Sequence, residues 1–468
     1  MHRNLRFSVS LLLGSIQFFF SQYLVHAESA AQTSRPHIVV FLADDLGWGD
    51  VGYHGSPIKT PHIDALAAAG TRLNRFYVMP VCSPTRGALL TGRHPIRLGL
   101  QCGVVRPWAS HGLPTDERTL PQALRNVGYK TAIIGKWHLG HNDPAFLPTQ
   151  RGFDHQYGHY NGALDYFTHI RDGGHDWHRN DRRNNDEGYT TELIADEAVR
   201  VIQQHDPDEP LFLYVPFNAP HTPNQAPQNY IEQYPEIKQQ KRRIYAGMVA
   251  CMDNAIGQIM KQLDDSGFAA EETLVLFTSD NGGIRQFGSV GPWRGQKGKL
   301  YEGGVRSPTV AVWQGQLAAG HQVDEPLHIV DLYPTLLRIA GADLEQDKEL
   351  DGINAWPTIA DGKPSPHDTI LLNNTPFTAA ILEGDWKLVR NGQIAANQTQ
   401  APSGDTWELF NLATDPTESE NLYSKRPGIA ARLQSALDGY ASQAVEPNIP
   451  PNRAPAQFKS PAVWGEPE

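Results

Sequence analysis

Cysteine is scarce in this chain, which has only three among its 468 residues: Cys82, Cys102 and Cys251. An odd number excludes complete pairing into disulfides within the chain, so an exported form keeps at least one unpaired cysteine. If Cys82 is the residue consumed by other chemistry, Cys102 and Cys251 either form a disulfide or remain buried thiols. The sequence alone does not decide between these two outcomes.

Positive charge is also in short supply. Lys and Arg number 40 against 51 Asp and Glu, which gives a formal net charge of −11 at pH 7. This balance argues against nucleic acid as a partner. An anionic ligand must instead be held by Arg, Lys and His side chains that cluster in one pocket. The rest of the composition, 40% hydrophobic and 19% charged, is that of an ordinary globular protein.

Long apolar runs are confined to the N-terminus. Arg3 and Arg6 precede an apolar stretch over residues 7–24, and Val-His-Ala at 25–27 places small residues at a cleavage site. This pattern is typical of a secretory signal peptide, with an uncleaved anchor as the alternative. It predicts export to a periplasm or the cell exterior, or to a lysosome in a eukaryote. No later segment is long and apolar enough to span a membrane, so stable membrane insertion is not expected.

Strand-like apolar runs alternate with helical patterns over most of the chain. The stretch 244–263, for example, repeats large apolar residues at helical spacing. Such alternation predicts an α/β fold, a large mixed and mainly parallel sheet sandwiched by helices. Sites in sheets of this kind form at the carboxyl ends of strands. The expected strands cover residues 37–42, 131–134, 211–215 and 273–277.

The character of the sequence changes after about residue 365. Short strand-like segments at 386–390 and 407–412 precede a helical pattern at 430–440 and a Pro-rich end. A chain of this length is expected to form one large domain and a smaller one. We therefore predict a signal peptide at 1–27, an α/β domain at 28–365, a subdomain with an antiparallel sheet and a helix at 366–445, and an irregular tail at 446–468.

Two pairs of acidic or amide residues follow expected strands. Asp44-Asp45 comes directly after the first strand, and Asp280-Asn281 lies just beyond the fourth. A single pair of this kind is more typical of a helix cap with a solvated charge. Two pairs at the carboxyl ends of strands, however, can converge on a hard cation through oxygen ligands alone. Ca²⁺ suits this set better than Mg²⁺, which prefers to keep several waters.

The segment Cys82-Ser83-Pro84-Thr85-Arg86, continued by Leu90-Thr91-Gly92, carries the most information about function. Pro84 predicts a helix over 84–90, whose N-terminus favours a developing anion. A lone cysteine is more often a small buried apolar residue. The segment nevertheless resembles the signature of the type I sulfatases of the alkaline phosphatase superfamily, and the other blocks of that family's site occur along this chain in the same order.

The resemblance implies a nucleophile and its cofactors. In that family the cysteine is oxidised to formylglycine by a formylglycine-generating enzyme, and the hydrated aldehyde is the nucleophile; the matching residue here is Cys82. Arg86 is implied to hold the nucleophile and the metal ligands through its fixed fork of donors. The implied Ca²⁺ ligands are Asp44, Asp45, Asp280 and Asn281, together with position 82.

Three further blocks resemble the basic residues of the family's site. The Gly-Lys-Trp-His block supplies Lys136, implied to contact sulfate oxygens, and His138, implied to deprotonate the hydrated aldehyde. His221 is implied to bind sulfate and to help protonate the leaving alcohol. The family places its last lysine five residues before a glutamate, which selects Lys297; Lys299 takes its place only if the register slips.

Within the family, the motifs resemble arylsulfatase B, the N-acetylgalactosamine-4-sulfatase, most closely. The resemblance implies a sulfuric ester hydrolase that acts on sulfated glycans such as 4-sulfated N-acetylgalactosamine or galactose units. A basic insert at 169–183 is usually a solvated loop, but it also suits a grip on a polyanion through His175, His178, Arg179, Arg182 and Arg183. Two other functions compete: a phosphonate or phosphate ester hydrolase of the same superfamily, and a non-catalytic sulfoglycan-binding protein.

Overall fold

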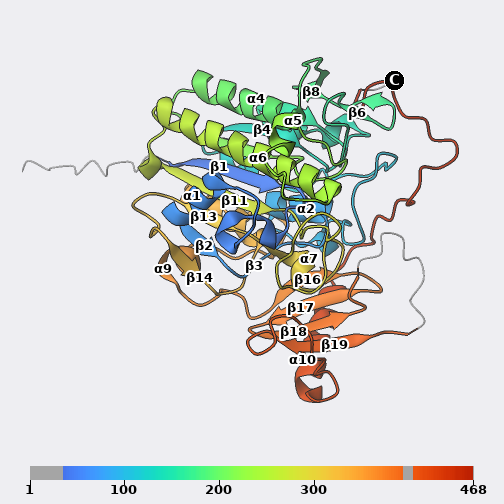
Figure 1. Cartoon of the computed structure of the whole chain (residues 1–468). Coiled ribbons are helices and arrows are strands. Elements are labelled where there is room, and N and C mark those ends of the chain that lie inside the picture. The colour runs from blue at the N-terminus through green and yellow to red at the C-terminus, as the bar shows by residue number, and fades with distance from the viewer. Residues whose placement is uncertain (1–34, 394–403, 467–468) are drawn as a thin grey trace, which may run out of the picture. The chain divides into compact units, whose positions relative to one another are not determined.

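Strand β1 (His37–Ala43) lies near the middle of a ten-stranded sheet and is buried on both faces. The computed structural model describes residues 35–393 and 404–466 (Figure 1), so the expected signal peptide falls outside the described residues. Along β1, Ile38 and Val40 belong to one apolar cluster, and Val39 and Phe41 belong to another. Successive side chains of a strand point to opposite faces, which explains why this strand is apolar throughout.

The central strands of the sheet are parallel, and shorter strands that mostly pair antiparallel extend it on both sides. The parallel strands are, in spatial order, β11 (Thr273–Ser279), β1, β10 (Leu211–Pro216), β4 (Lys130–Lys136) and β5 (His155–His159). Beyond β11 lie β13 (Val310–Val312), β2 (Thr71–Leu73) and β14 (His321–Val323), and beyond β5 lie β8 (His178–Arg179) and β9 (Arg182–Arg183).

Helices cover both faces of this sheet. Figure 1 shows α4 and α6, in green, lying together over one face. The helices that pack into the cluster containing Val39 are α1 (Pro61–Ala69), α4 (Thr190–Gln204) and α6 (Gln240–Asp265). Those on the other face are α2 (Cys82–Thr91), α3 (Leu120–Arg125), α8 (Leu332–Ile339) and α9 (Trp356–Asp361). The predicted α/β architecture is therefore confirmed.

The C-terminal part contains the expected antiparallel sheet and helix. Its strands are β16 (Ile370–Asn374), β17 (Ala379–Glu383), β18 (Trp386–Arg390) and β19 (Trp407–Asn411), and α10 (Pro427–Ala441) packs on one face. The other face packs against Tyr77, Leu300 and Val305 of the larger part. Residues from Arg35 onward form one compact unit, and the boundary near residue 365 stays a prediction.

Small elements complete the structure. A three-stranded sheet contains β12 (Arg306–Ser307), β3 (Phe76–Tyr77) and β15 (Leu327–His328), and β6 (Ile170–Arg171) pairs with β7 (Gly174–His175). Two short helices are α5 (Gln228–Ile231) and α7 (Glu302–Val305). In the described ranges, no helix combines the length and apolarity that crossing a membrane requires.

Residues 446–466 form neither helix nor strand, yet they are bound along the larger part. Figure 1 shows this tail, in dark red, running back from the C-terminal sheet to the region of β6 and β8. Its Trp464 is only 2% exposed and donates its backbone N–H to the carbonyl of His175. Specific contacts thus hold this irregular segment in place.

A buried ion cluster joins the two parts. Lys387 Nζ of β18 lies 2.9 Å from Glu302 Oε1 and 2.8 Å from Glu418 Oε1, and all three side chains are buried. Tyr77 donates its hydroxyl to Glu302 Oε2 at 3.0 Å. The glutamate of the Glu-Gly-Gly block is therefore an architectural residue that ties helix α7 to the C-terminal sheet.

Replacing Lys387 by Met should lower the free energy of unfolding by about 3–5 kcal/mol, because two carboxylates would stay buried without their counter-charge. Urea denaturation followed by fluorescence measures the change. The control is Lys425→Met, since the Lys425–Glu420 pair is largely exposed and should contribute less than about 1 kcal/mol. Equal effects of the two substitutions would contradict the structural role of the cluster.

Candidate active site

The two acidic pairs lie at the same edge of the sheet. β1 and β11 are parallel neighbours with Ala43 opposite Ser279, so Asp44-Asp45 and Asp280-Asn281 leave the sheet side by side. All four side chains are fully buried. Because carboxylates lose hydration on burial, this edge requires positive charge or a cation to compensate.

The backbone at Asp45 adopts a strained conformation. Its φ angle is +67°, in the left-handed region, which costs a non-glycine residue about 1 kcal/mol or more. The resulting turn lets Asp45 N–H donate to Asp280 Oδ1 at 3.2 Å and lets Asn281 Nδ2 donate to Asp45 Oδ1 at 2.7 Å. The two pairs are thus locked to each other.

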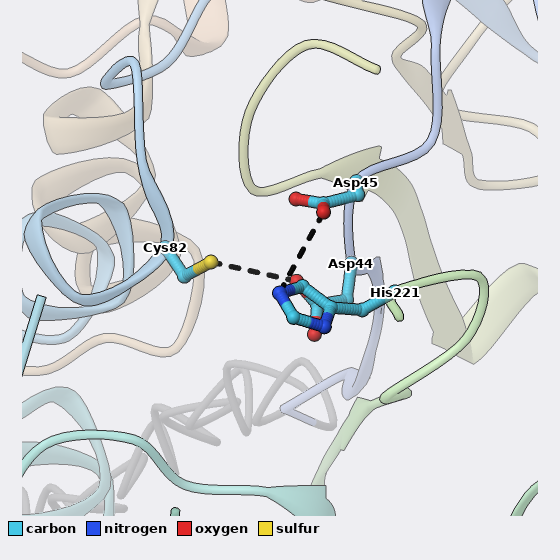
Figure 2. A group of neighbouring side chains, drawn as sticks. All are labelled: Asp44, Asp45, Cys82 and His221. Atoms are coloured by element: carbon cyan, nitrogen blue, oxygen red, sulfur yellow. Dashed lines mark hydrogen bonds and ion pairs between the residues drawn. The ribbon is translucent and has the colours of Figure 1, made fainter. Parts of the chain in front are cut away.

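Cys82 is the first residue of α2 and lies against this acidic cluster. Its Sγ is 3.5 Å from Asp44 Oδ1 and 3.4 Å from Lys297 Nζ. Figure 2 shows the thiol pointing from the start of the helix toward Asp44. Burial, together with the charge of Asp280, raises the pKa of Cys82 to about 12. At neutral pH this residue is a protonated thiol, which is a poor nucleophile.

Arg86, one turn further along α2, binds the acidic cluster through its guanidinium group. Its Nε and Nη2 both donate to Asp280 Oδ2, at 3.1 and 2.8 Å, and its Nη1 donates to the carbonyl of Lys136 at 2.9 Å. The side chain is fully buried, and the neighbouring carboxylates raise its pKa despite the burial that opposes its charge. Arg86 therefore acts as a positioning residue that connects α2, β4 and the end of β11.

Two lysines neutralise the first acidic pair. Lys136 Nζ lies 2.6 Å from Asp44 Oδ2, and Lys297 Nζ lies 2.6 Å from Asp45 Oδ1. Although burial opposes its charge, Asp45 raises the pKa of Lys297 above its ordinary value. Lys299 is outside the site, where its ammonium contacts the side chain of Gln393. The structure thus places Lys297, and not Lys299, beside Cys82.

His138 is held with one ring nitrogen unused. Its Nε2 lies 3.0 Å from the carbonyl of Val105, so Nε2 carries the proton and donates it there, while the buried Nδ1 has no hydrogen-bond partner among the described residues. Burial, with the charges of Lys136 and Arg86, lowers the pKa of His138 well below its ordinary value. The neutral ring therefore offers a free lone pair that suits a proton acceptor.

His221 approaches the acids from the loop after β10. Its Nδ1 lies 2.6 Å from the carbonyl of Thr222 and its Nε2 lies 3.6 Å from Asp45 Oδ2, the contact drawn in Figure 2. Burial and the charge of Lys297 lower the pKa of His221 to about 3. A proton on Nε2 is consequently held weakly and is readily given up.

A cavity of about 220 Å³ lies next to the acidic cluster and its basic neighbours. Its walls include Cys82, His138, His221 and Lys297. Lys136, Arg86 and the acidic residues do not line the cavity, but Asp44 contacts Cys82 and Asp45 contacts Lys297 in its wall. The structure therefore brings the whole set of sequence-predicted residues together, and the distances above define how they pair.

Two arginines in the cavity wall were not predicted from the sequence. Arg106 comes from the loop after residue 102, where no motif marks it, and Arg171 comes from the insert at 169–183. Arg182 and Arg183, two of the residues that the sequence suggested for a polyanion, lie on the edge strand β9 and do not line this cavity. The composition of the insert was informative, but it did not indicate which arginine faces the site.

The donor set fits a hard cation. Asp44, Asp45, Cys82 and His221 each present a ligand atom within 4.8 Å of the others. Asp45 Oδ2 and Asn281 Oδ1 are buried acceptors that receive no hydrogen bond from the described residues. Acceptors left in this state are costly, and a cation would satisfy both. Asp280 faces the same cluster, but its oxygens already accept from Arg86 and from Asp45 N–H.

Comparison with known proteins decides the family. The family model described as Sulfatase matches residues 36–342, which is most of the chain. The chain belongs to the sulfatase family. It is therefore a sulfuric ester hydrolase, as the arylsulfatases among its relatives are.

Relatives in this family cover nearly the whole chain. Arylsulfatase J of Mus musculus is 37% identical over 93% of this chain and 81% of its own length. The N-acetylgalactosamine-6-sulfatase of Homo sapiens is 35% identical over 82% of this chain and 80% of its own. The crystal structure of Ps i-CgsB in complex with k-i-k-neocarrahexaose superposes with a TM-score of 0.80 at 31% identity, covering 88% of this chain and 94% of that one. The specific likeness to arylsulfatase B stays a prediction.

Gly162→Ala should lower kcat for sulfate ester hydrolysis by about tenfold or more. A Cβ at this position would lie 2.4 Å from Cε1 and Nε2 of His138, so the ring must move out of its place. The control is Gly428→Ala in α10, where a Cβ meets nothing within 4 Å. Unchanged kcat in Gly162→Ala would show that the position of the His138 ring is not critical.

Proposed function

We propose that the chain hydrolyses sulfate monoesters of sulfated glycans, with formylglycine made from Cys82 as the nucleophile and a bound Ca²⁺. The observation that supports this most directly is the position of Cys82, in the cavity wall between Lys297 Nζ and Asp44 Oδ1. A thiol whose pKa is about 12 is not activated for attack, so oxidation of this residue is the simplest account of its placement.

The basic residues divide the work of binding and proton transfer. The ammonium groups of Lys297, in the cavity wall, and of buried Lys136 attract the sulfate oxygens in a water-poor site. His221 Nε2 gives its weakly held proton to the leaving sugar oxygen, because an anionic ester in the cavity favours the protonated ring. His138 Nδ1, which has no hydrogen-bond partner among the described residues, accepts a proton from the nucleophile position when sulfate is released.

The acidic residues hold the proposed Ca²⁺. Asp44, Asp45, Asp280 and Asn281 would bind it together with position 82. Asp44, Asp45 and Cys82 present ligand atoms within 4.8 Å of one another, and Asn281 Oδ1 accepts no hydrogen bond from the described residues. The ion would supply electrostatic activation of the oxygen nucleophile. In the structure Lys136 and Lys297 pair with Asp44 and Asp45 and compensate part of their charge.

Sulfated galactose-type sugars are the proposed substrates. The relatives include an N-acetylgalactosamine-6-sulfatase and a structure solved with a neocarrahexaose. We expect 4-sulfated N-acetylgalactosamine or galactose units, as the likeness to arylsulfatase B implies. Export through the N-terminal signal and maturation by a formylglycine-generating enzyme are parts of the same proposal.

The wild-type protein, produced together with a formylglycine-generating enzyme, should release sulfate from 4-sulfated N-acetylgalactosamine or a 4-sulfated galactan faster than from the 6-sulfated sugar. Cys82→Ala and Cys82→Ser should release none, because both lack the aldehyde. Ion chromatography of sulfate measures the rate, and peptide mass spectrometry reports the aldehyde at position 82. Full activity in Cys82→Ala, or cleavage of phosphonate esters alone, would overturn the proposal.

Removing the metal should abolish activity and lower the melting temperature. Dialysis against a chelator followed by Ca²⁺ should restore both, because a ligand that binds only the folded state stabilises it. Asp45→Asn should weaken Ca²⁺ binding in calorimetry, whereas Asp264→Asn, at an exposed position of α6, should not. A chelated protein that keeps its activity and its melting temperature would exclude the metal.

A further inference from the structure

Arg106 and Arg171 line the cavity but have no part in the proposed chemistry. They share its wall with Cys82 and His138, and both side chains are only partly buried. They come from segments 65 residues or so apart in sequence, so their meeting is a product of the fold. Two cationic groups in the wall of one cavity are suited to bind an anion there.

The charges of the two arginines are weakly compensated. In the described part of the chain, no carboxylate forms an ion pair with Arg106, and Arg171 pairs with its sequence neighbour Asp172, which is 46% exposed. Burial and the nearby charge of Arg171 lower the pKa of Arg106, which records the cost of holding both cations here. An anion placed between them would relieve this repulsion.

The C-terminal tail holds both arginines in place. Arg106 Nη2 donates to Asn452 Oδ1 at 3.2 Å, and the neighbouring Trp108 Nε1 donates to the carbonyl of Pro451 at 2.7 Å. Trp464 Nε1 donates to the carbonyl of Arg171 at 2.9 Å. Because the tail fixes these segments from outside, the arginines are organised before a ligand arrives, which reduces the entropy lost on binding.

We propose that Arg106 and Arg171 form a second anion subsite, which binds a further sulfate or a carboxylate on the sugar that bears the scissile ester or on the sugar next to it. This inference rests on the proposed function, since it assigns the substrate class of the same cavity. The enzyme then prefers glycans with two nearby anionic groups over singly sulfated neutral sugars. A small aryl sulfate carries no second anion and does not use the subsite.

The test compares Arg106→Gln and Arg171→Gln with Arg182→Gln, an exposed arginine of the same insert that lies outside the cavity. The substrates are 4-methylumbelliferyl sulfate and three matched disaccharides whose neighbouring sugar is neutral, carries a uronate or carries a second sulfate. Each cavity variant should raise KM about tenfold or more for the anionic disaccharides, because a charge-assisted contact is lost. For the anionic disaccharides, kcat should change by less than about twofold. For 4-methylumbelliferyl sulfate and the disaccharide with a neutral neighbouring sugar, both KM and kcat should change by less than about twofold. Arg182→Gln should match the wild type, and the disaccharide most affected identifies the anion.

Three results would overturn the subsite. Equal losses on all substrates would mean that the arginines bind the transferred sulfate or stabilise the fold. Unchanged KM values would mean that they are solvated and bind no part of the substrate. A wild type without preference for the anionic disaccharides would contradict the proposed specificity.

A binding measurement separates this inference from the proposed function. Calorimetry in the Cys82→Ala background, which cannot turn over, should still show weaker binding of the anionic disaccharide when either arginine is replaced. If the wild type releases no sulfate but this difference in binding persists, the proposed reaction fails and the subsite stands.

Discussion

The burial of three carboxylates in one place is the constraint on which the rest of the site depends. Burial and mutual repulsion raise the pKa of Asp44 to about 7, whereas Lys297 and His221 outweigh burial and lower that of Asp45 to about 2. Such a cluster is stable only if cations reach it from several directions, because no single neighbour compensates all of the charge. The compensating residues are Arg86 of α2, Lys136 at the end of β4 and Lys297 of the loop before α7.

The C-terminal sheet contributes to this arrangement by holding the loop that carries Lys297. Leu300 N–H donates to the carbonyl of Gly392, and the guanidinium of Arg294 lies 3.8 Å from the ring centroid of Tyr301 and 2.9 Å from Glu408. The buried cluster around Lys387 fixes the helix that follows. A part of the chain with no residue in the cavity wall therefore helps to determine where Lys297 lies.

Much of the fold and of the site could be predicted because the signals are local. Each core strand is a short apolar run, and polar residues at the strand ends fall at one edge of the sheet once the strands are parallel. The left-handed turns at Asp45 and His138 could not be predicted, because tertiary contacts impose them against local preference. Arg106 and Arg171 were missed for a related reason: their role depends on which way two irregular loops face, and no periodic pattern records that.

The burial of Cys82 limits when the proposed oxidation of this residue can take place while the chain is being made. Every residue of α2 is buried, so a modifying enzyme cannot reach the sulfur once this helix has packed. Lys297, which closes one side of the site, is synthesised 215 residues after Cys82, and the tail that braces the cavity comes last of all. In the interval between the synthesis of Cys82 and that of Lys297 and the tail, the nascent segment around Cys82 is accessible. A protein that folds faster, or that is released to fold before it meets the enzyme of the proposed modification, would reach its stable form with an unmodified thiol at position 82.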